Sequence, residues 1–473
     1  MNYKSIFFFL GVFVIFVSFF SVLNILYAVY FNFIIDLNSY LITFISSLLI
    51  GSFFLYIGKS YSKNISTSEQ IIFIVLSFVF IPVLISIPYY LSIYNISFLN
   101  SYFESVSGFT TTGFSIIKNV EVIDEPLLLW RSSSQWLGGL LFLLVTIGTI
   151  GSKQLKIKPS YLISGGASGR NFYNNFNANF IKIFLIYFFS TLSVIFLLSI
   201  NNIRLLDAFN IAFTIVASGG FIPTNDLSTI IKSNFQVFVL SFTLLIPIFN
   251  FFILFDLITK KFKTENHQED LHLLILIALS TSFFYFFSVS NESLVNILLA
   301  ITSSISTSGI TTYVPAKNST LFYILLTMVG GSLISTSSGF KYIRIYILLK
   351  TSYQEILRIV KPLNIIDKNL FNRETKIGDH DIRIAFLVFI SFIFSIFVLS
   401  SILSFDALNY ESSFKISILT LTNTLSSSLY GLENVVFFDL NNLSKITLIC
   451  FMLLGKIEVI TIFFLISRFI FRE

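Results

Sequence analysis

Long apolar runs, separated by short polar connections, recur along the whole chain. Each run holds about 18 residues or more, the length that an α-helix needs to cross the hydrocarbon core of a bilayer. The runs lie at about 5–30, 40–58, 70–95, 127–151, 178–200, 233–259, 270–289, 319–349, 381–404 and 443–471. The pattern therefore predicts an all-α polytopic membrane protein.

The low charge of the chain agrees with this prediction. Only 11% of its 473 residues are charged and 55% are hydrophobic, with a mean hydropathy of +0.86, whereas soluble domains carry about 25% charged residues. Three histidines and one cysteine leave little for a metal site, and the sequence lacks the clustered His, Asp or Glu that an enzyme would need at one membrane face. We therefore expect neither an enzyme nor a covalently bound cofactor.

The basic residues of the connections gather on one side of the predicted membrane. Counted from the N-terminus, every cluster falls on the side of Lys4. The clusters are Lys59 and Lys63; Lys153, Lys156, Lys158 and Arg170; Lys260, Lys261 and Lys263; Lys350, Arg358, Lys361, Lys368, Arg373 and Lys376; and Arg468 and Arg472. Because cytoplasmic connections carry an excess of Lys and Arg, both termini are expected in the cytoplasm. The net charge of +6 is assigned to these connections and not to nucleic-acid binding.

Four short apolar stretches that end in small hydroxyl residues lie on the opposite, outer side. They occupy 102–115, 208–226, 296–313 and 416–434, each between two full spans. Aligned on their last small residues, they read Thr111-Thr112-Gly113, Ser218-Gly219-Gly220, Thr307-Ser308-Gly309 and Ser427-Ser428-Leu429. Each stretch is too short to span, so the repeat predicts a re-entrant helix and a turn between two spans.

This repeat divides the chain into five parts. Two N-terminal transmembrane helices (1–65) precede four membrane–pore-loop–membrane units that surround one pore. The units are expected at 66–170, 171–264, 265–376 and 377–473, and the inner helix of the third is interrupted.

The chemistry of the four stretches suits an alkali cation. Irregular backbone at membrane depth is tolerated only where it is buried in protein or lines a water-filled path. Carbonyl and hydroxyl oxygens can replace the hydration shell of a cation, and the C-terminal ends of the short helices also favour positive charge. Any one stretch alone could be a surface for helix packing. Four such stretches on the same side of the membrane favour an ion filter.

Several motifs resemble the Trk/Ktr/HKT superfamily of cation transporters, and the TrkH-like potassium-translocating subunit in particular. They are SVSGFTTTG (105–113), LWRSSSQWLGGL (129–140), ASGGF (217–221), STSGITT (306–312), GGS and STSSGFKYIRI (within 330–345) and LLGKIEVIT (453–461). The resemblance implies potassium uptake across a bacterial inner membrane by a homodimer, with a cytosolic nucleotide-binding regulatory partner. It places potassium at Thr112, Gly113, Gly219, Gly220, Ser308, Gly309 and Ser428.

The resemblance also implies a gate. The interrupted stretch 330–341 would form a loop below the filter that obstructs the pore until the partner acts; a Ser-rich packed helix is the alternative. The implied gate residues are Gly330, Gly331, Ser335, Thr336, Gly339, Lys341 and Lys456. The family usually has Arg at the last of these positions, as a barrier to cations.

A charge in mid-membrane is by default a sign of function. For Lys456, pairing with a buried acid or snorkelling to the cytoplasmic side remains open. Snorkelling is the expected role of Lys341 and Arg344, with gating by Lys341 as a minority hypothesis.

Other residues raise further questions. Leu429 stands where the family usually has Gly, so a sodium-permeable or non-selective transporter is an alternative. An ion-coupled secondary transporter is another alternative, although its repeats would be expected to run in opposite orientations.

Arg131 is expected at the outer interface, and Glu104 either attracts cations or bonds to the first short helix. In the QWLGG motif, residues 135–139, the glycines should let helices approach closely.

Overall fold

The computed structural model confirms the all-α fold. It describes residues 3–33, 36–60, 67–150, 172–258, 267–287, 292–316, 319–361, 369–371, 377–406, 408–432 and 435–458. Six of the described helices are long and apolar enough to cross a membrane. The other predicted spans are interrupted or only partly described.

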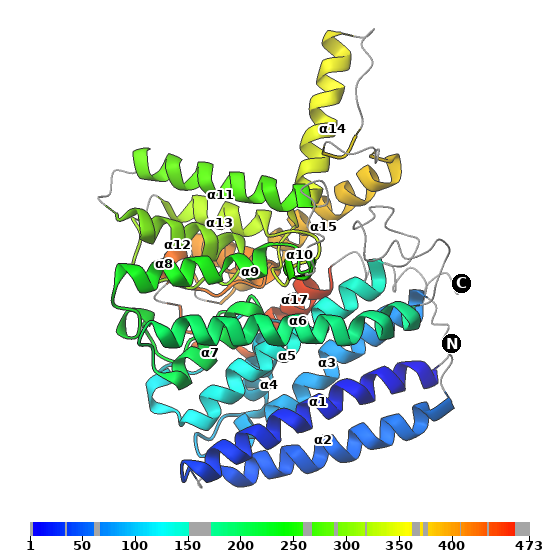
Figure 1. The fold of residues 1–473 in the computed structure, drawn as a ribbon, viewed down its shortest axis with the longest axis vertical. Coiled ribbons are helices and arrows are strands. Elements are labelled where there is room, and N and C mark those ends of the chain that lie inside the picture. Colours follow the sequence, from blue (N-terminus) through cyan, green and yellow to red (C-terminus); the bar gives the residue numbers. More distant parts are fainter. Residues whose placement is uncertain are drawn as a thin grey trace.

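Two long helices form one edge of the bundle (Figure 1). Helix α1 spans Tyr3–Tyr30 and α2 spans Leu37–Ile57. Their backbones come close at two glycines, because a Cβ on Gly11 would lie 3.0 Å from the Gly51 carbonyl oxygen. The Ser21 hydroxyl donates to the Tyr40 carbonyl over 2.6 Å and ties the second half of α1 to the start of α2.

The rest of the chain repeats one arrangement: a long helix, a short helix of 12 residues, a turn, and a second long or interrupted helix. In the first unit these are α3 (Thr67–Leu91), α4 (Phe98–Phe109) and α5 (Glu125–Ile150). In the second they are α6 (Phe172–Ile200), α7 (Leu205–Val216), α8 (Asn234–Thr243), α9 (Leu245–Ile248) and α10 (Phe252–Ile258). In the third they are α11 (Gln268–Phe287), α12 (Leu294–Ile305), α13 (Thr320–Val329) and α14 (Tyr342–Val360). In the fourth they are α15 (Asp379–Leu403), α16 (Tyr410–Leu421) and α17 (Asn442–Ile457).

The short helices stop about half-way through a bilayer. Twelve residues rise about 18 Å, against a hydrocarbon core about 30 Å thick. In α4 and α12 the Ser97 and Ser293 hydroxyls accept hydrogen bonds from backbone amides at the first turn. These caps satisfy amides that no helix carbonyl can reach.

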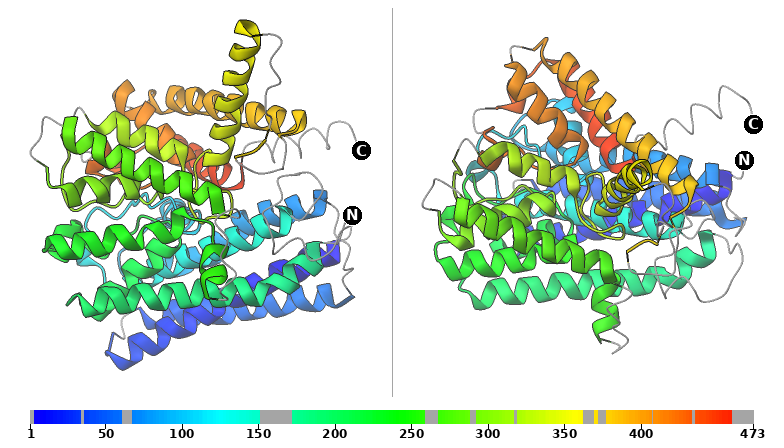
Figure 2. Two further views of the ribbon diagram at one scale, coloured as in Figure 1. Left: turned by 45° about the horizontal axis from the view of Figure 1, so that its top comes forward. Right: turned by 90° about the horizontal axis from the view of Figure 1, so that it is seen from above.

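Two predicted spans are not continuous, and a third is described only in part. The stretch 233–259 is divided into α8, α9 and α10, and 319–349 is interrupted between α13 and α14 by the non-helical 330–341 segment. Helix α14 projects away from the bundle (Figure 1; also Figure 2). Helix α17 ends at Ile457, and its predicted continuation to 471 lies outside the described residues.

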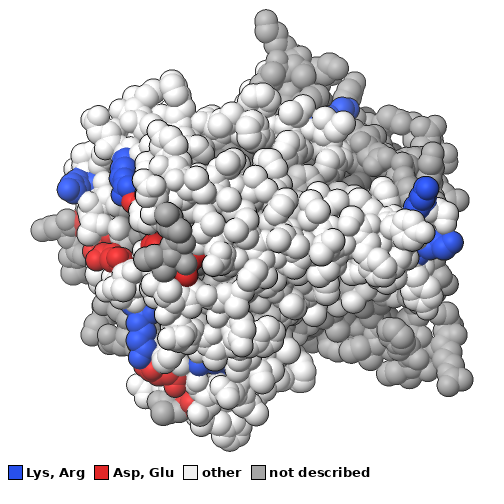
Figure 3. All heavy atoms as spheres, turned by 90° about the horizontal axis from the view of Figure 1, so that it is seen from below, with Lys and Arg blue, Asp and Glu red and all other residues white. Residues whose placement is uncertain are grey.

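On the face that Figure 3 shows, the charges of the described residues lie toward the ends of the molecule. Figure 3 shows a broad uncharged band between an end with both signs of charge and an end where the visible charges are basic. The ion pairs Lys118–Asp439 and Arg204–Glu125 join connections at the end where the short helices begin. Lys4 donates to Ser60 at the opposite end. An uncharged band of this kind is typical of a membrane-embedded protein.

Close packing of α5 on two short helices positions the turns. A Cβ on Gly138 would lie 1.8 Å from the Phe109 carbonyl oxygen at the end of α4, and one on Gly139 would lie 2.9 Å from Ala217 Cα at the end of α7. The Trp136 indole donates to Thr191 over 3.0 Å and fills the space beside α6. The expected role of the two glycines is confirmed.

We predict that Gly138→Ala lowers the midpoint of thermal unfolding, because the added methyl group collides with backbone that cannot move away. Overpacking costs about 1–3 kcal/mol in soluble cores. The matched control is Gly378→Ala, where the nearest atom, at 3.2 Å, is the end of the Asp381 side chain. Equal midpoints for the two variants in detergent would contradict the close packing of α5 on α4.

Candidate functional site

Each of the four short helices ends in the same left-handed turn. The second residue after the helix has a positive φ in all four: Thr111 at 59°, Ser218 at 61°, Thr307 at 60° and Asn423 at 48°. Residues with a side chain rarely adopt this conformation, so the recurrence is a structural repeat. We name the turns loop 1 (110–113), loop 2 (217–220), loop 3 (306–309) and loop 4 (422–425).

Backbone hydrogen bonds close each turn. In loop 1 the Thr111 amide donates to the Gly108 carbonyl and the Thr112 amide donates to the Ser107 carbonyl, both over 2.9 Å. The second bond, which reaches back five residues, recurs from Gly219 to Thr214, from Ser308 to Ser303 and from Thr424 to Leu419. This pattern is the Schellman motif, which satisfies carbonyls at the end of a helix without water.

The turn corrects the alignment of the fourth loop. Its left-handed residue is Asn423, so Asn423-Thr424-Leu425 corresponds to Thr111-Thr112-Gly113, and Ser427-Ser428-Leu429 follows it. Ser428–Tyr430 forms a separate 3-10 turn, and Leu429 is fully buried in an apolar cluster. The run of three serines misled the alignment, whereas Asn, which tolerates the left-handed conformation, marks the turn.

The four loops meet at their last residues. A Cβ on Gly113 would lie 2.9 Å from Gly220 Cα, and one on Gly220 would lie 2.4 Å from Leu425 Cβ. A Cβ on Gly309 would lie 2.7 Å from the Leu425 carbonyl oxygen. Gly113 and Gly309 also have φ of 85° and 70°, which glycine adopts without steric cost. Leucine therefore takes the fourth place in a ring of glycines.

Side chains link the loops to one another. The Ser218 hydroxyl lies 3.1 Å from the Thr307 hydroxyl, which joins loops 2 and 3. The Asn423 amide donates to the Thr112 hydroxyl and to the Met452 carbonyl, each over 2.9 Å. The position of the four loops around one axis is thus held by hydrogen bonds between loops and by packing.

An open cavity of about 440 Å³ lies on the side of this ring from which the short helices enter, the side predicted to face outward. All four repeats contribute to its wall, including Gly113, Gly220, Ile310 and Leu425. Hydroxyl groups from Thr224, Thr311, Thr312 and Ser426–Ser428 make much of the remaining lining polar. The ring therefore closes the bottom of a water-accessible vestibule.

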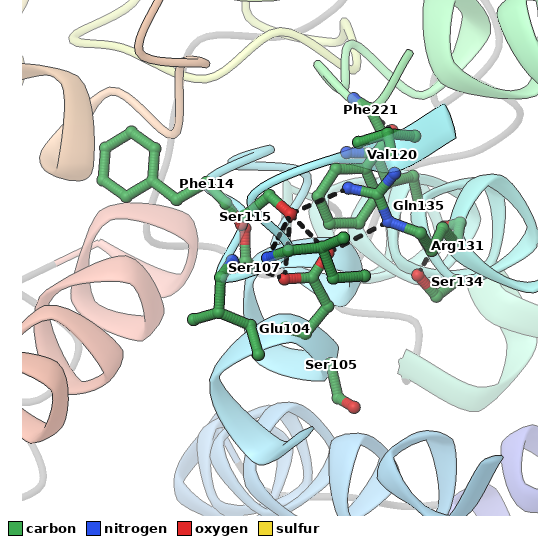
Figure 4. A network of polar contacts seen from close by, with 12 residues as sticks. Glu104, Ser105, Ser107, Phe114, Ser115, Val120, Arg131, Ser134, Gln135 and Phe221 are labelled. Atoms are coloured by element: carbon green, nitrogen blue, oxygen red, sulfur yellow. Dashed lines mark hydrogen bonds and ion pairs between the residues drawn. The ribbon is translucent and has the colours of Figure 1, made fainter. Parts of the chain in front are cut away.

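A buried ion pair supports loop 1 (Figure 4). Arg131 Nε lies 3.0 Å from Glu104 Oε1, and the two side chains are 2% and 0% exposed. Glu104 also accepts from the Ile116 amide over 2.9 Å and from the Ser115 hydroxyl, which in turn accepts from Arg131 Nη2. The guanidinium lies 4.1 Å from the centre of the Phe221 ring, just after loop 2.

These contacts settle two expectations. Arg131 was expected at the outer interface; its side chain is buried between the segments that follow loops 1 and 2, and it contributes to the wall of the vestibule. Glu104 bonds to the segment that leaves loop 1 and does not face the vestibule. Gln135, on α5, reaches the other loop: its side-chain oxygen accepts from the Phe221 amide over 3.2 Å and would lie 2.3 Å from a Cβ on Gly219.

The 330–341 segment lies against the loops on the side opposite the vestibule, which we call the inner side. The Thr336 hydroxyl donates to the Val216 carbonyl at the end of α7, and the Ser338 amide donates to the Thr307 hydroxyl of loop 3, both over 2.9 Å. Gly330 and Gly339 have φ of 65° and 82° where the segment leaves and rejoins helical structure. A continuous Ser-rich helix, the alternative reading, is not what the structure adopts.

Two buried lysines bind this segment. Lys456 Nζ donates to the Thr111 hydroxyl over 2.7 Å, to the Ser338 hydroxyl over 3.1 Å and to the Thr336 carbonyl over 3.4 Å. Its ammonium also lies 4.4 Å from the centre of the Phe142 ring. Lys456 therefore connects loop 1 to the 330–341 segment.

The charged neighbours of Lys456 do not behave as expected. Lys341 is 3% exposed and bonds to the 330–341 segment, so its predicted snorkelling is wrong. Arg344, predicted to snorkel, instead forms an ion pair of 2.8 Å with Glu458. Among the described residues, neither Lys341 nor Lys456 has a carboxylate within 4.0 Å.

We predict that Arg131→Met destabilises the protein strongly, because it leaves the Glu104 carboxylate buried without its cation. Breaking one partner of a buried pair costs about 3–5 kcal/mol. The control is Lys118→Met, which breaks an exposed pair whose side chains are 54% and 60% exposed and should cost about 1 kcal/mol or less. Unfolding in detergent measures both, and similar losses would refute the support of loop 1 by the buried pair.

Comparisons with known proteins cover nearly the whole chain. No family model matches it. The chain is 26% identical over 462 residues to an uncharacterized cation transporter of Methanocaldococcus jannaschii, covering 91% of this chain and 90% of the relative. It is 25% identical over 453 residues to the Trk system potassium uptake protein TrkG of Escherichia coli, covering 92% of each.

The fold has a close structural counterpart. The crystal structure of the potassium transporter TrkH from Vibrio parahaemolyticus matches 98% of both chains with a TM-score of 0.83 and 20% sequence identity. This match confirms the predicted fold class, and the relatives are transporters, as expected of a chain that is not an enzyme. The chain therefore has the TrkH fold and is similar in sequence, over about nine-tenths of its length, to Trk system potassium uptake proteins.

Proposed function

We propose that this protein takes up potassium across the cytoplasmic membrane through a channel-like pore, with loops 1–4 as its ion filter. The observation that carries the proposal is the convergence of four left-handed turns of the same type at the base of one vestibule. The names of the relatives, which include potassium uptake proteins, support potassium as the cargo.

Backbone and hydroxyl oxygens would bind the ion. The proposed potassium ligands remain Thr112, Gly113, Gly219, Gly220, Ser308 and Gly309, and in the fourth loop the corrected register replaces Ser428 by Thr424. The membrane potential supplies about 2.3 kcal/mol per charge for each 100 mV. Inward movement of a cation therefore needs no chemistry within this chain.

A sodium-permeable or poorly selective transporter is the second candidate. The observation in its favour is Leu425, which takes the place of glycine in the ring and contacts both Gly220 and Gly309. A Cβ at this position alters the spacing of the loop carbonyls, and ion discrimination depends on the number and arrangement of such carbonyls.

The 330–341 segment and Lys456 would form the gate. The segment bonds to loop 2 and loop 3 from the inner side, and Lys456 bonds to loop 1. A buried ammonium beneath the filter opposes the passage of a cation, because charges interact strongly where water is excluded. Uptake would then require the segment and Lys456 to move aside.

A homodimer and a cytosolic nucleotide-binding regulatory subunit remain part of the proposal, as does an orientation with both termini in the cytoplasm. The resemblance to the family supports them. The partner would dock on the inner side, where α14 projects from the bundle (Figure 1) and exposes Leu349, Tyr353, Ile356 and Ile359.

Uptake of radioactive rubidium into liposomes tests the proposed function, with potassium or sodium as competitor. We expect potassium to block uptake of rubidium more strongly than sodium does. Equal competition would favour the second candidate, and no uptake with the regulatory partner supplied would contradict transport altogether.

The corrected register yields a separate prediction. Leu425→Gly should increase the preference for potassium over sodium, because it completes the ring of glycines. Leu429→Gly, the matched control, should leave the preference unchanged and instead lower stability, because Leu429 is fully buried in an apolar cluster. The reverse outcome in competition assays would restore the original alignment of the fourth loop.

The proposed gate yields a further prediction. Lys456→Met should raise rubidium flux in the absence of the regulatory partner by at least about tenfold, because one buried charge at about 4 Å opposes a cation by several kcal/mol even in a polarisable protein. Lys445→Met, which removes a buried lysine on the outer part of α17, should leave this flux low. Equal flux through the two variants would argue against Lys456 as a barrier.

A further inference from the structure

The ammonium of Lys341 is enclosed by oxygen atoms of a single short stretch. It donates to the Ser332 carbonyl over 3.1 Å, to the Ser335 carbonyl over 3.2 Å, to the Ser335 hydroxyl over 3.1 Å and to the Ser337 carbonyl. All four groups are buried. We call these four oxygen atoms the Lys341 cage.

The composition of the cage is that of a cation site. An ammonium group has three donors and no acceptor, and each hydrogen bond described for Lys341 Nζ goes to a carbonyl or hydroxyl oxygen. Among the described residues, the acids contribute none of these contacts. The hydrogen bonds of the ammonium are therefore all to neutral groups, as in the carbonyl rings that hold an unhydrated monovalent cation, while Glu269 and Glu458 act on its charge from beyond 4.0 Å.

The shape of the 330–341 segment depends on these contacts. Residues 332–337 form no helix, and their carbonyls turn inward toward one point. Lys341 itself has φ of 75°, a conformation that costs a side-chain-bearing residue free energy and persists only where its surroundings fix it. Without the ammonium, the Ser332 carbonyl and the Ser335 hydroxyl would keep their hydrogen bonds within the segment, whereas the buried Ser335 and Ser337 carbonyls would lose the one that they accept from Lys341.

The second lysine does not fill the cage. Lys456 bonds to the Thr336 carbonyl and the Ser338 hydroxyl, the groups that alternate with those of the cage along the segment. The Phe142 ring lies beside both ammoniums, at 4.4 Å from Lys456 Nζ and 5.7 Å from Lys341 Nζ. The two cations therefore act at separate points: Lys456 ties the segment to loop 1, whereas Lys341 shapes the segment itself.

We propose that the 330–341 segment contains a monovalent-cation site that the protein fills with its own lysine. The tethered ammonium of Lys341 is the template around which the segment folds into the shape that lies beneath loops 1–4. When the lysine side chain is removed, the cage accepts a free monovalent cation or a small primary ammonium. That this shape obstructs the pore rests on the proposed function; the existence of the cage does not.

Chemical rescue of Lys341→Ala tests the proposal. Thermal unfolding of the purified full chain is measured in detergent at constant ionic strength, with methylammonium, potassium or tetramethylammonium chloride. We expect Lys341→Ala to lose stability and to regain it in a saturable way with methylammonium or potassium. Tetramethylammonium, which carries the same charge but has no N–H donor and is too large for the cage, should not restore it.

Two further variants separate the cage from cation binding elsewhere. Lys341→Met keeps the side chain long but uncharged, so it should lose stability without rescue, because the methionine occupies the cage. Lys445→Ala removes a buried lysine that donates to Asn100 Oδ1 and the Phe438 carbonyl, away from the 330–341 segment. Its response to added cations should equal that of the wild type, which includes any binding at the loops.

The outcomes distinguish the cage from the transport function. A response of Lys341→Ala to cations no greater than that of the wild type would overturn the cage. If Lys341→Ala cannot be purified even in methylammonium, a Lys341→Met protein as stable as the wild type and with equally low rubidium leak would overturn it instead. Failure of the wild type to transport rubidium would refute the proposed function and leave the unfolding result standing.

Discussion

Irregular backbone inside a membrane must find its hydrogen-bond partners within the protein, and this constraint shapes the centre of the molecule. Each short helix ends half-way through the bilayer, where its last carbonyls could not be left to lipid. The Schellman turn satisfies these carbonyls in four places and brings the next residues toward a common axis. The architecture of the site therefore follows from how four helix ends are closed.

Support for the turns comes from neighbouring helices. Helix α5 approaches two short helices through adjacent glycines, and it also carries Arg131 and Gln135, which reach the segments beside loops 1 and 2. A single helix therefore sets the position of half of the ring. On the vestibule side of the ring, hydroxyl groups contribute to the lining. On the opposite side lie the buried ammonium groups of Lys456 and Lys341.

The difference between the two faces has an electrostatic consequence. Carbonyl and hydroxyl oxygens on the outer side favour a cation, and the positive charges below oppose one. Neither lysine has a carboxylate within 4.0 Å among the described residues, although Glu269 and Glu458 act on the charge of Lys341 from a greater distance. In the proposed transporter, a cation would bind in loops 1–4. It could not pass through until the contacts of Lys456 and the 330–341 segment with the loops are rearranged.

Much of this arrangement could be predicted from the sequence. Apolar run length located the long helices, and the repeat of small hydroxyl residues located three of the four turns. The prediction of the fourth turn was wrong because the serines at 426–428 resemble the motif of the other three. The turn itself is at Asn423, which tolerates a left-handed conformation but is not a small hydroxyl residue.

Contacts between elements that are distant in the sequence could not be predicted from it. The pair Glu104–Arg131 joins residues on two helices, and their burial depends on how those helices cross. The Lys341 cage needs a non-helical path through 332–337, which hydropathy does not encode; a serine-rich stretch inside an apolar run was the visible signal that the helix is broken there.

A structure of the protein determined in rubidium, with the ion located by its anomalous scattering, would test the central claim most directly. The account predicts rubidium on the axis between Gly113, Gly220, Gly309 and Leu425, at the base of the vestibule, with oxygens of loops 1–4 as its ligands. Rubidium bound beside Ser427–Leu429, or absent from the ring while bound elsewhere in the molecule, would contradict it.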